Sequence, residues 1–190
     1  MNLIEHLQQV RDFRTQPVYP LWVVLLLAIM GTMSGYQGYR PLAAFVHRHQ
    51  TQLLEVLQLP HSRLPSLSTL RRLLVRVDFE SLSEVFNAWA GEHYGPLSHS
   101  QIATDGKSIK MSVKDYDQSY QDFVVLVSAF SVEHGVVVGL APMHNGETSE
   151  IATVQALLSG LKLKGVCFSL DALHTQKKQW SKLSPVATII

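Results

Sequence analysis

The sequence predicts an α+β protein in which an all-helical domain precedes a mixed β-sheet with helices. Apolar residues recur at helical spacing through the first hundred positions, but from about residue 101 they form short continuous runs separated by turn residues. The type of basic residue changes at the same place. Every arginine precedes residue 100, and every lysine follows it. The chain has 190 residues, 46% hydrophobic and 16% charged, which suffices for one domain or two small ones. We therefore predict domains at 1–95 and 96–190.

The first helices are predicted from apolar spacing and from prolines. Residues 2–10 are expected to form a short amphipathic helix, after which Pro17 and Pro20 fix an extended linker. The segment 21–33 opens with an apolar run of about ten residues, whereas a membrane-spanning helix needs roughly 20. Acidic residues lie upstream, where a signal peptide would carry a basic region. We therefore expect a buried helix and no membrane contact.

Three more helices complete the first half, and one of them carries a basic face. They are expected from Tyr39 to Pro60, from a Ser66 or Ser68 cap to about Val77, and from Asp78 onward. In the second of these, the leucines from Leu67 to Leu74 should face inward, and the outward side chains are Arg71, Arg72 and Arg76.

These three arginines could lie along a DNA backbone, where each phosphate contact adds salt-dependent affinity. The alternative is an ordinary solvated helix face. The net charge of +1 and the pI near 7.9 give no general argument for nucleic acid. The helix is therefore a candidate DNA contact on its local charge alone.

The second half contains strand-like runs with one helix among them. Strands are expected at 101–105, 123–130, 136–140 and 165–171, with a helix from Thr148 to about Leu158 before the last strand. Residues 110–122 are polar and are expected to form an exposed loop. Three strands, a helix and a fourth strand in this order predict a mixed sheet of ribonuclease H-like topology.

Two of these strands lead into an aspartate. Asp105 is expected to end the first strand before Gly106, and Asp171 to end the last. Asp is a poor strand former, so its presence there points to a use for the carboxylate. Two such carboxylates that meet within a few ångströms could hold Mg²⁺, or Mn²⁺, for phosphoryl transfer. The alternative is that each Asp caps a turn or the following helix. Asp105 and Asp171 are thus the candidate catalytic and metal-binding residues.

Other polar residues give weaker signals. His144 and His174 could join a site for softer metal ions, but each stands beside polar loop residues and is better explained as a surface histidine. Cys167 is the single cysteine and lies in an apolar run, so the chain has no internal disulfide and suits a reducing cytoplasm.

Successive sequence blocks resemble those of a known family. In the second half they lie at 102–107, 126–130, 147–151 and 170–176, and in the first half they are Asp12-Phe13-Arg14, Tyr19-Pro20-Leu21 and Leu64-Pro65-Ser66 with Thr69. These blocks are similar to the insertion-sequence transposases of the H-repeat-associated protein type and to the N-terminal domain associated with them. The resemblance spans about residues 8–178.

This resemblance implies a DDE transposase, in which an acid triad on a ribonuclease H-like fold binds two Mg²⁺ ions. Such an enzyme cuts and rejoins DNA at the terminal inverted repeats of its element. Asp105 matches the first acid and Asp171 the second. Lys107, close to the first acid, joins the arginines as a candidate DNA contact. No position matches the third acid, because Glu147 and Glu150 belong to a block between the first two.

We therefore expect an incomplete catalytic domain from a truncated copy of a transposase. The alternative function is a non-catalytic DNA-binding or interaction protein that modulates a full-length transposase. Such a protein would act as a homodimer, or as a heterodimer with the full-length enzyme.

Overall fold

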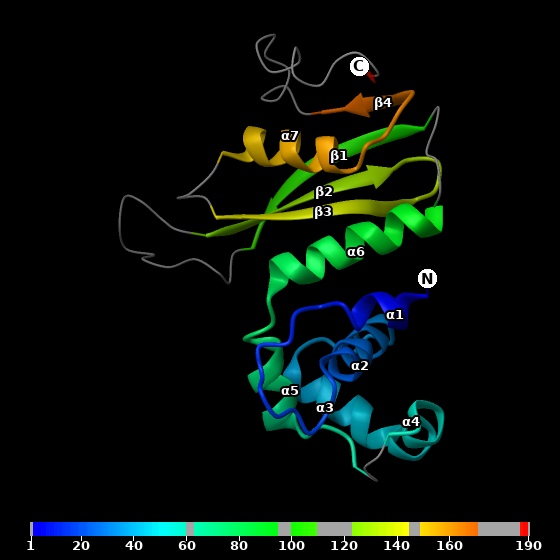
Figure 1. Ribbon diagram of the computed structural model, residues 1–190, viewed down its shortest axis with the longest axis vertical. Helices are drawn as coiled ribbons and strands as arrows, with labels where there is room; N and C mark the ends of the chain where they lie inside the picture. Colours follow the sequence, from blue (N-terminus) through cyan, green and yellow to red (C-terminus); the bar gives the residue numbers. More distant parts are fainter. Residues whose placement is uncertain are drawn as a thin grey trace. The chain divides into compact units, whose positions relative to one another are not determined.

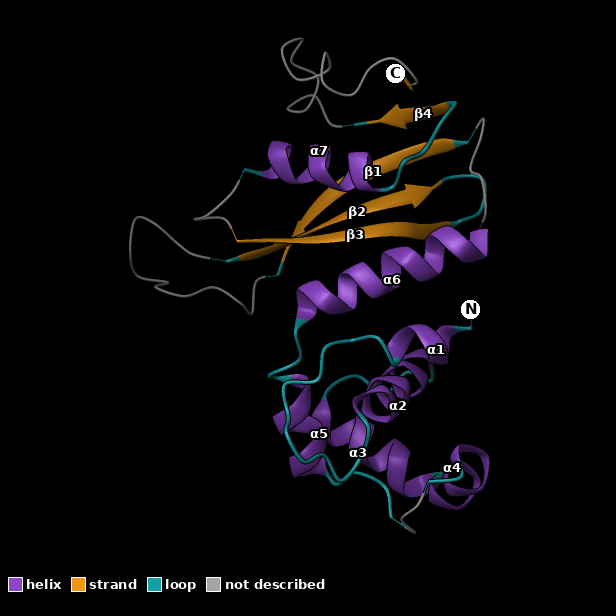
Figure 2. Cartoon of the chain, in the orientation of Figure 1, coloured by secondary structure: helices purple, strands orange, loops and turns teal. Residues whose placement is uncertain are grey.

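The computed structural model of the protein describes residues 2–59, 63–94, 100–109, 123–144, 149–170 and 187–189. The chain divides into two compact units, Asn2–Leu82 and Ser83–Ile190. Helices make up the first unit, whereas a mixed β-sheet with helices makes up the second (Figure 1, Figure 2). The prediction of an α+β chain with a helical part before a mixed sheet is therefore confirmed.

The helical unit is built around α2. Its helices are α1 Leu3–Leu7, α2 Leu21–Met33, α3 Tyr39–Arg48, α4 Gln50–Leu57 and α5 Leu67–Leu74. Val23, Val24 and Leu27 of α2 are completely buried in a core that includes Phe45 of α3 and Leu70 of α5. With 13 residues, α2 is about 20 Å long, which is shorter than the roughly 30 Å of membrane hydrocarbon. Among the described residues, no helix has the length and apolarity to cross a membrane.

α5 has the predicted faces, with one exception. Ser66 caps the helix, because its Oγ accepts a hydrogen bond from the Thr69 backbone N–H. The leucines at positions 70 and 73 are buried, and all three arginines of this segment are exposed. Leu67 is 39% exposed, so its predicted inward position is wrong. It lies four residues before Arg71 and therefore shares the outward face of the helix.

α6, Phe79–Tyr94, continues from the end of the helical unit into the second unit. Its Asn87 side chain donates a 2.9 Å hydrogen bond to the Leu140 carbonyl and accepts a 2.7 Å hydrogen bond from the Leu140 N–H. Leu140 lies on β3, Val136–His144, which forms one edge of the sheet. The helix thereby covers part of an open sheet edge. Because of this attachment, the two compact units divide upstream of the boundary predicted near residue 95.

The sheet has the strand order β3-β2-β1-β4-β5. The further strands are β1 Gln101–Ser108, β2 Val124–Ser131, β4 Val166–Ser169 and β5 Ala187–Ile189. β1 pairs antiparallel with β2 and parallel with β4, while β2–β3 is antiparallel and β4–β5 is parallel. This is the predicted mixed sheet of ribonuclease H-like topology. The short strand β5 was not predicted from the sequence.

One face of the sheet carries the core of this unit. α7, Glu150–Gly160, packs Val154, Leu157 and Leu158 against alternate buried residues of β2, namely Val125, Val127 and Ala129. Ile102 and Thr104 of β1 pair with Ser131 and Ala129 and lie on this same face. Because side chains alternate along a strand, Ala103, Asp105 and Lys107 point to the opposite face.

Candidate functional site

Asp105 presents its carboxylate from within β1. It is exposed, its cross-strand partner is Ser128 of β2, and its carbonyl accepts a 3.4 Å hydrogen bond from the Ser128 Oγ. The prediction that Asp105 ends its strand is wrong, because β1 continues to Ser108 and stays paired with β2 up to Val125. The partner strand supplies the hydrogen bonds that an isolated run containing Asp and Gly would lack.

Asp171, the second predicted acid, lies outside the described residues, so its distance from Asp105 stays a prediction. The structure does confirm that the two strands leading toward these acids are neighbours. β1 and β4 are parallel, and their register pairs Ala103 with Ser169. Each of these partners lies two residues before one of the two acids.

A further carboxylate, that of Glu150, approaches β1 at Gly106 from the face covered by α7, which is opposite to the face that carries Asp105. A Cβ built on Gly106 would overlap Oε1 of Glu150 and would lie 2.7 Å from its Cδ. Glu150 opens α7, so the helix places this side chain where a strand residue other than glycine would stand. The sequence interpretation set Glu150 aside because it precedes the second acid. The available signal was Gly106 itself, since a glycine inside a strand often marks the close approach of another group.

The remaining predicted polar residues add little to this site. Lys107 is exposed and lies on the same face of β1 as Asp105. His144 is exposed at the end of β3, whereas Glu147 and His174 lie outside the described residues. Within the described ranges there is no group of three or more His, Cys, Asp or Glu side chains that could hold a metal ion.

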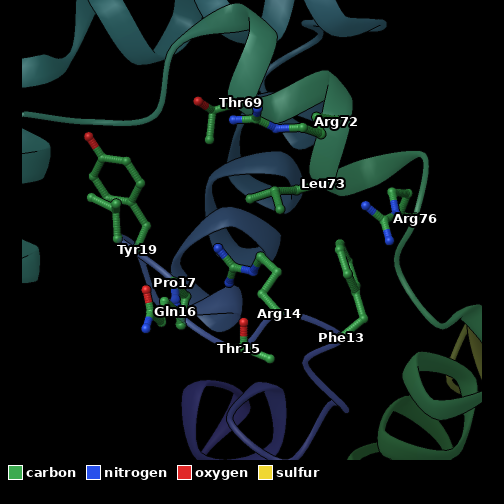
Figure 3. A pocket seen from close by; sticks show the side chains of 11 residues that line it. Phe13, Arg14, Thr15, Gln16, Pro17, Tyr19, Thr69, Arg72, Leu73 and Arg76 are labelled. Carbon is green, nitrogen blue, oxygen red and sulfur yellow. The ribbon is translucent and has the colours of Figure 1, made fainter.

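The predicted DNA-contacting arginines border two hollows of the helical unit. The first, called here the linker groove, has a volume of about 450 Å³ and lies between the segment Phe13–Tyr19 and the side chains of Thr69, Arg72, Leu73 and Arg76 (Figure 3). The second, called here the α5 hollow, has a volume of about 760 Å³ and is lined by Ser66, Leu67, Ser68, Arg71, Arg72, Val75 and Arg76. The structure therefore brings the basic helix and the proline-containing linker together, which the sequence interpretation treated separately.

Comparison with known proteins gives one family and several relatives. Residues 4–90 match the family described as DDE_Tnp_1-associated. The H repeat-associated putative transposases YhhI and YbfD of Escherichia coli K12 are each 28% identical to this chain over 179 residues, which is 93% of the chain. The putative transposase YncI of Escherichia coli O157:H7 is 26% identical over 185 residues.

The similarity covers only part of each relative. The matched region is 46% of YhhI, 46% of the O157:H7 YncI and 69% of YbfD. The chain therefore spans about half the length of two of these relatives. The crystal structure of the Mos1 strand transfer complex matches 94% of this chain and 60% of that chain with a TM-score of 0.33 and 16% identity, which is too distant to support an argument.

Proposed function

We propose that this chain, whose residues 4–90 match the DDE_Tnp_1-associated family and which is similar to putative transposases over most of its length, takes part in the cutting and rejoining of DNA at the ends of an insertion sequence. The helical unit would hold the terminal inverted repeats, and the sheet would supply two metal-binding acids, Asp105 and Asp171. The lone Cys167 suits the cytoplasm, where such an element would act.

The observation that carries this proposal is the parallel pairing of β1 with β4. Ala103 and Ser169 are partners, so a register that continued for two residues would set Asp105 beside Asp171. Neighbouring strands are about 4.8 Å apart. Carboxylates brought this close by the backbone could bind one divalent cation together or two cations side by side.

The two candidate acids are of the type that a hard divalent cation prefers. Mg²⁺ prefers oxygen ligands and commonly takes one or two carboxylates together with water and phosphate oxygens, and Mn²⁺ accepts similar ligands. Asp105 is exposed, so its carboxylate is accessible to an ion and to DNA. When bound, such ions activate the attacking oxygen and stabilise the leaving oxygen in phosphoryl transfer. Lys107, on the same face, would attract the DNA phosphates toward the carboxylates.

A metal-binding measurement on the whole chain tests this assignment. We expect Mn²⁺ binding, followed by electron paramagnetic resonance, to weaken by about tenfold or more in Asp105→Asn and in Asp171→Asn, since even outer-shell changes cost about 10- to 100-fold. Glu55→Gln, which removes an exposed carboxylate from α4, is the matched control and should leave the affinity unchanged. Equal affinity in all four proteins would contradict the proposal.

The second candidate function is DNA binding without cleavage, with the chain modulating a full-length transposase as its heterodimer partner or acting as a homodimer. The observation that favours it is the family match, which is confined to residues 4–90 and thus to the helical part and α6. Size-exclusion chromatography with light scattering, with and without the full-length enzyme, distinguishes the two assemblies. A chain that stays monomeric in both mixtures would exclude this candidate.

A further inference from the structure

The linker groove has cationic and hydroxyl-bearing walls. Its described lining includes Arg14, Arg72 and Arg76 together with Thr15 and Thr69, and none of its described lining residues is acidic. Its volume of about 450 Å³ falls within the roughly 300–1,000 Å³ of ligand pockets. Guanidinium and hydroxyl groups are the side-chain donors that most often contact phosphate. The lining therefore selects an anion.

Arg14 is already neutralised. Its Nε and Nη2 donate to the two carboxylate oxygens of Asp12 at 2.9 and 2.7 Å, and its backbone N–H donates to the same carboxylate at 3.0 Å. The side-chain hydrogen bond from Arg14 is the largest cause that lowers the pKa of Asp12, so this carboxylate stays charged. Arg14 thus fixes the start of the linker and has little charge to offer an anion.

Arg72 and Arg76 provide the free positive charge of the groove. Both are exposed, and within the described residues the structure shows neither of them in an ion pair. The guanidinium carbon of Arg76 lies 4.7 Å from the centre of the Phe13 ring, which is a cation–π contact (Figure 3). A cation–π contact leaves the charge of the guanidinium in place, so Arg76 can still donate hydrogen bonds to an anion. Arg72 lies on α5 and Arg76 lies in the turn that follows the helix, and both side chains line the linker groove.

We propose that the linker groove is a preformed seat for one phosphodiester of a DNA strand, with Arg72 and Arg76 as its phosphate contacts and Phe13 as the residue that positions Arg76. This inference rests on the proposed DNA binding and names the site where it occurs. Preorganisation reduces the entropic cost of binding, and here it comes from Pro17, from the Asp12–Arg14 pair and from the Phe13 ring.

The neighbouring α5 hollow argues for a polymer over a free phosphate ion. Arg72 and Arg76 line both hollows, so the cationic surface continues from one into the other. The α5 hollow adds the exposed apolar side chains of Leu67 and Val75, which are 39% and 63% exposed. A cationic surface that adjoins exposed apolar side chains matches a DNA strand, in which charged phosphates are linked by deoxyribose sugars that carry apolar C–H surface.

The decisive experiment measures the affinity of the full chain for an element-end duplex by fluorescence anisotropy over a series of salt concentrations. Arg72→Gln and Arg76→Gln should each weaken binding roughly tenfold at low salt, the usual cost of a lost hydrogen bond to a charged group. Each should also reduce the salt slope by about 0.9, the value for one phosphate contact on duplex DNA. The matched control is Arg40→Gln, which removes an exposed arginine from α3, and it should stay within about twofold.

Variants of Phe13 test whether its ring positions the Arg76 side chain. Phe13→Leu should weaken binding by roughly two- to fivefold, the range of an exposed cation–π contact, while the salt slope stays unchanged because no charge is lost. Phe13→Tyr keeps the ring and should restore the affinity. If Phe13→Tyr is as weak as Phe13→Leu, the positioning role of the ring is wrong.

Three further outcomes overturn the inference in distinguishable ways. If the wild-type chain does not bind the duplex, both the proposed function and the proposed phosphate seat are wrong. The wild-type chain could instead bind the duplex while Arg72→Gln, Arg76→Gln and Arg40→Gln all weaken binding equally. The proposed function would then hold, and only the proposed phosphate seat would be wrong. Displacement of the duplex by inorganic phosphate at constant ionic strength would show a site for free anions instead.

Discussion

At the scale of single residues, Gly106 has the tightest Cβ contact among the described glycines of the second unit. It lies in β1 next to Asp105, and the end of the Glu150 side chain occupies the space that a Cβ would fill. Because this is the end of a flexible side chain, a substitution would displace the Glu150 carboxylate more than the backbone. Because Gly106 faces α7 and Asp105 faces the other side of β1, a change at Gly106 tests how Glu150 packs against the strand.

We expect Gly106→Ala to lower the free energy of unfolding by about 0.5–1.5 kcal/mol, the usual cost of forcing a side chain off its preferred rotamer. In a Glu150→Ala background the same substitution should raise it by about 0.4–1 kcal/mol, because alanine restricts the unfolded chain. Urea denaturation measures both values. Gly91→Ala in α6, where a Cβ meets nothing within 4 Å, is the control and should stabilise in both backgrounds.

The Asp12–Arg14 pair predicts a pH dependence. The hydrogen bond from Arg14 holds the pKa of Asp12 below its ordinary 3.8. A carboxyl group with a lowered folded-state pKa stabilises the protein fully above its unfolded pKa, and this contribution disappears as the pH falls through the folded value. The free energy of unfolding, measured between pH 7 and the acid range, should therefore fall less steeply below about pH 4 in Asp12→Asn than in the wild type. Parallel curves for the two proteins would show that the pair contributes nothing.

At the scale of elements, the Asn87 side chain joins α6 to β3 by two hydrogen bonds. Asn87→Ala removes two hydrogen bonds and leaves the partly buried N–H and C=O of Leu140 without these partners. We expect a loss of about 1–3 kcal/mol in the free energy of unfolding. Light scattering should also show more association at high concentration, because an uncovered edge strand can pair with another chain. Glu84→Ala, an exposed change on the same helix, should stay within about 0.5 kcal/mol.

At the scale of the whole molecule, the charged residues of the proposed function are divided between the two units. The free arginines belong to the helical unit and the candidate acids to the sheet unit. We expect the purified 190-residue chain to bind element-end DNA with Mg²⁺ or Mn²⁺ without nicking it, because the resemblance to DDE transposases assigns only two acids, Asp105 and Asp171, to these residues. Positioning and charge stabilisation supply nearly all the catalysis of phosphoryl transfer, so two acids should not suffice.

A gel assay for nicks at the element boundary checks this expectation, with Asp105→Ala as the control. Nicks that the wild type makes and the mutant does not would show that these 190 residues carry out the chemistry. Nicks made equally by both proteins would indicate a contaminating nuclease.

Much of the fold could be predicted because it depends on patterns close together in the sequence. Helical spacing located α2 as a buried helix and turned Arg71 and Arg72 outward, since both features follow from neighbours within one or two turns. The apolar runs in the second half similarly identified β1 to β4 and their order along the chain. The roles of Asp105 and Asp171 came from the resemblance to a family and stay predictions.

By itself, the sequence thus determined most of the helices and strands, though not the short strand β5, and the outward direction of the arginines on α5. Only the tertiary structure decided that β1 continues through Gly106, that Glu150 stands against this glycine, and that the linker and α5 enclose a groove. These features join residues far apart in the chain, such as Phe13 with Arg76 and Asn87 with Leu140. Local periodicity carries no information on such contacts, because they depend on how separate elements pack in space.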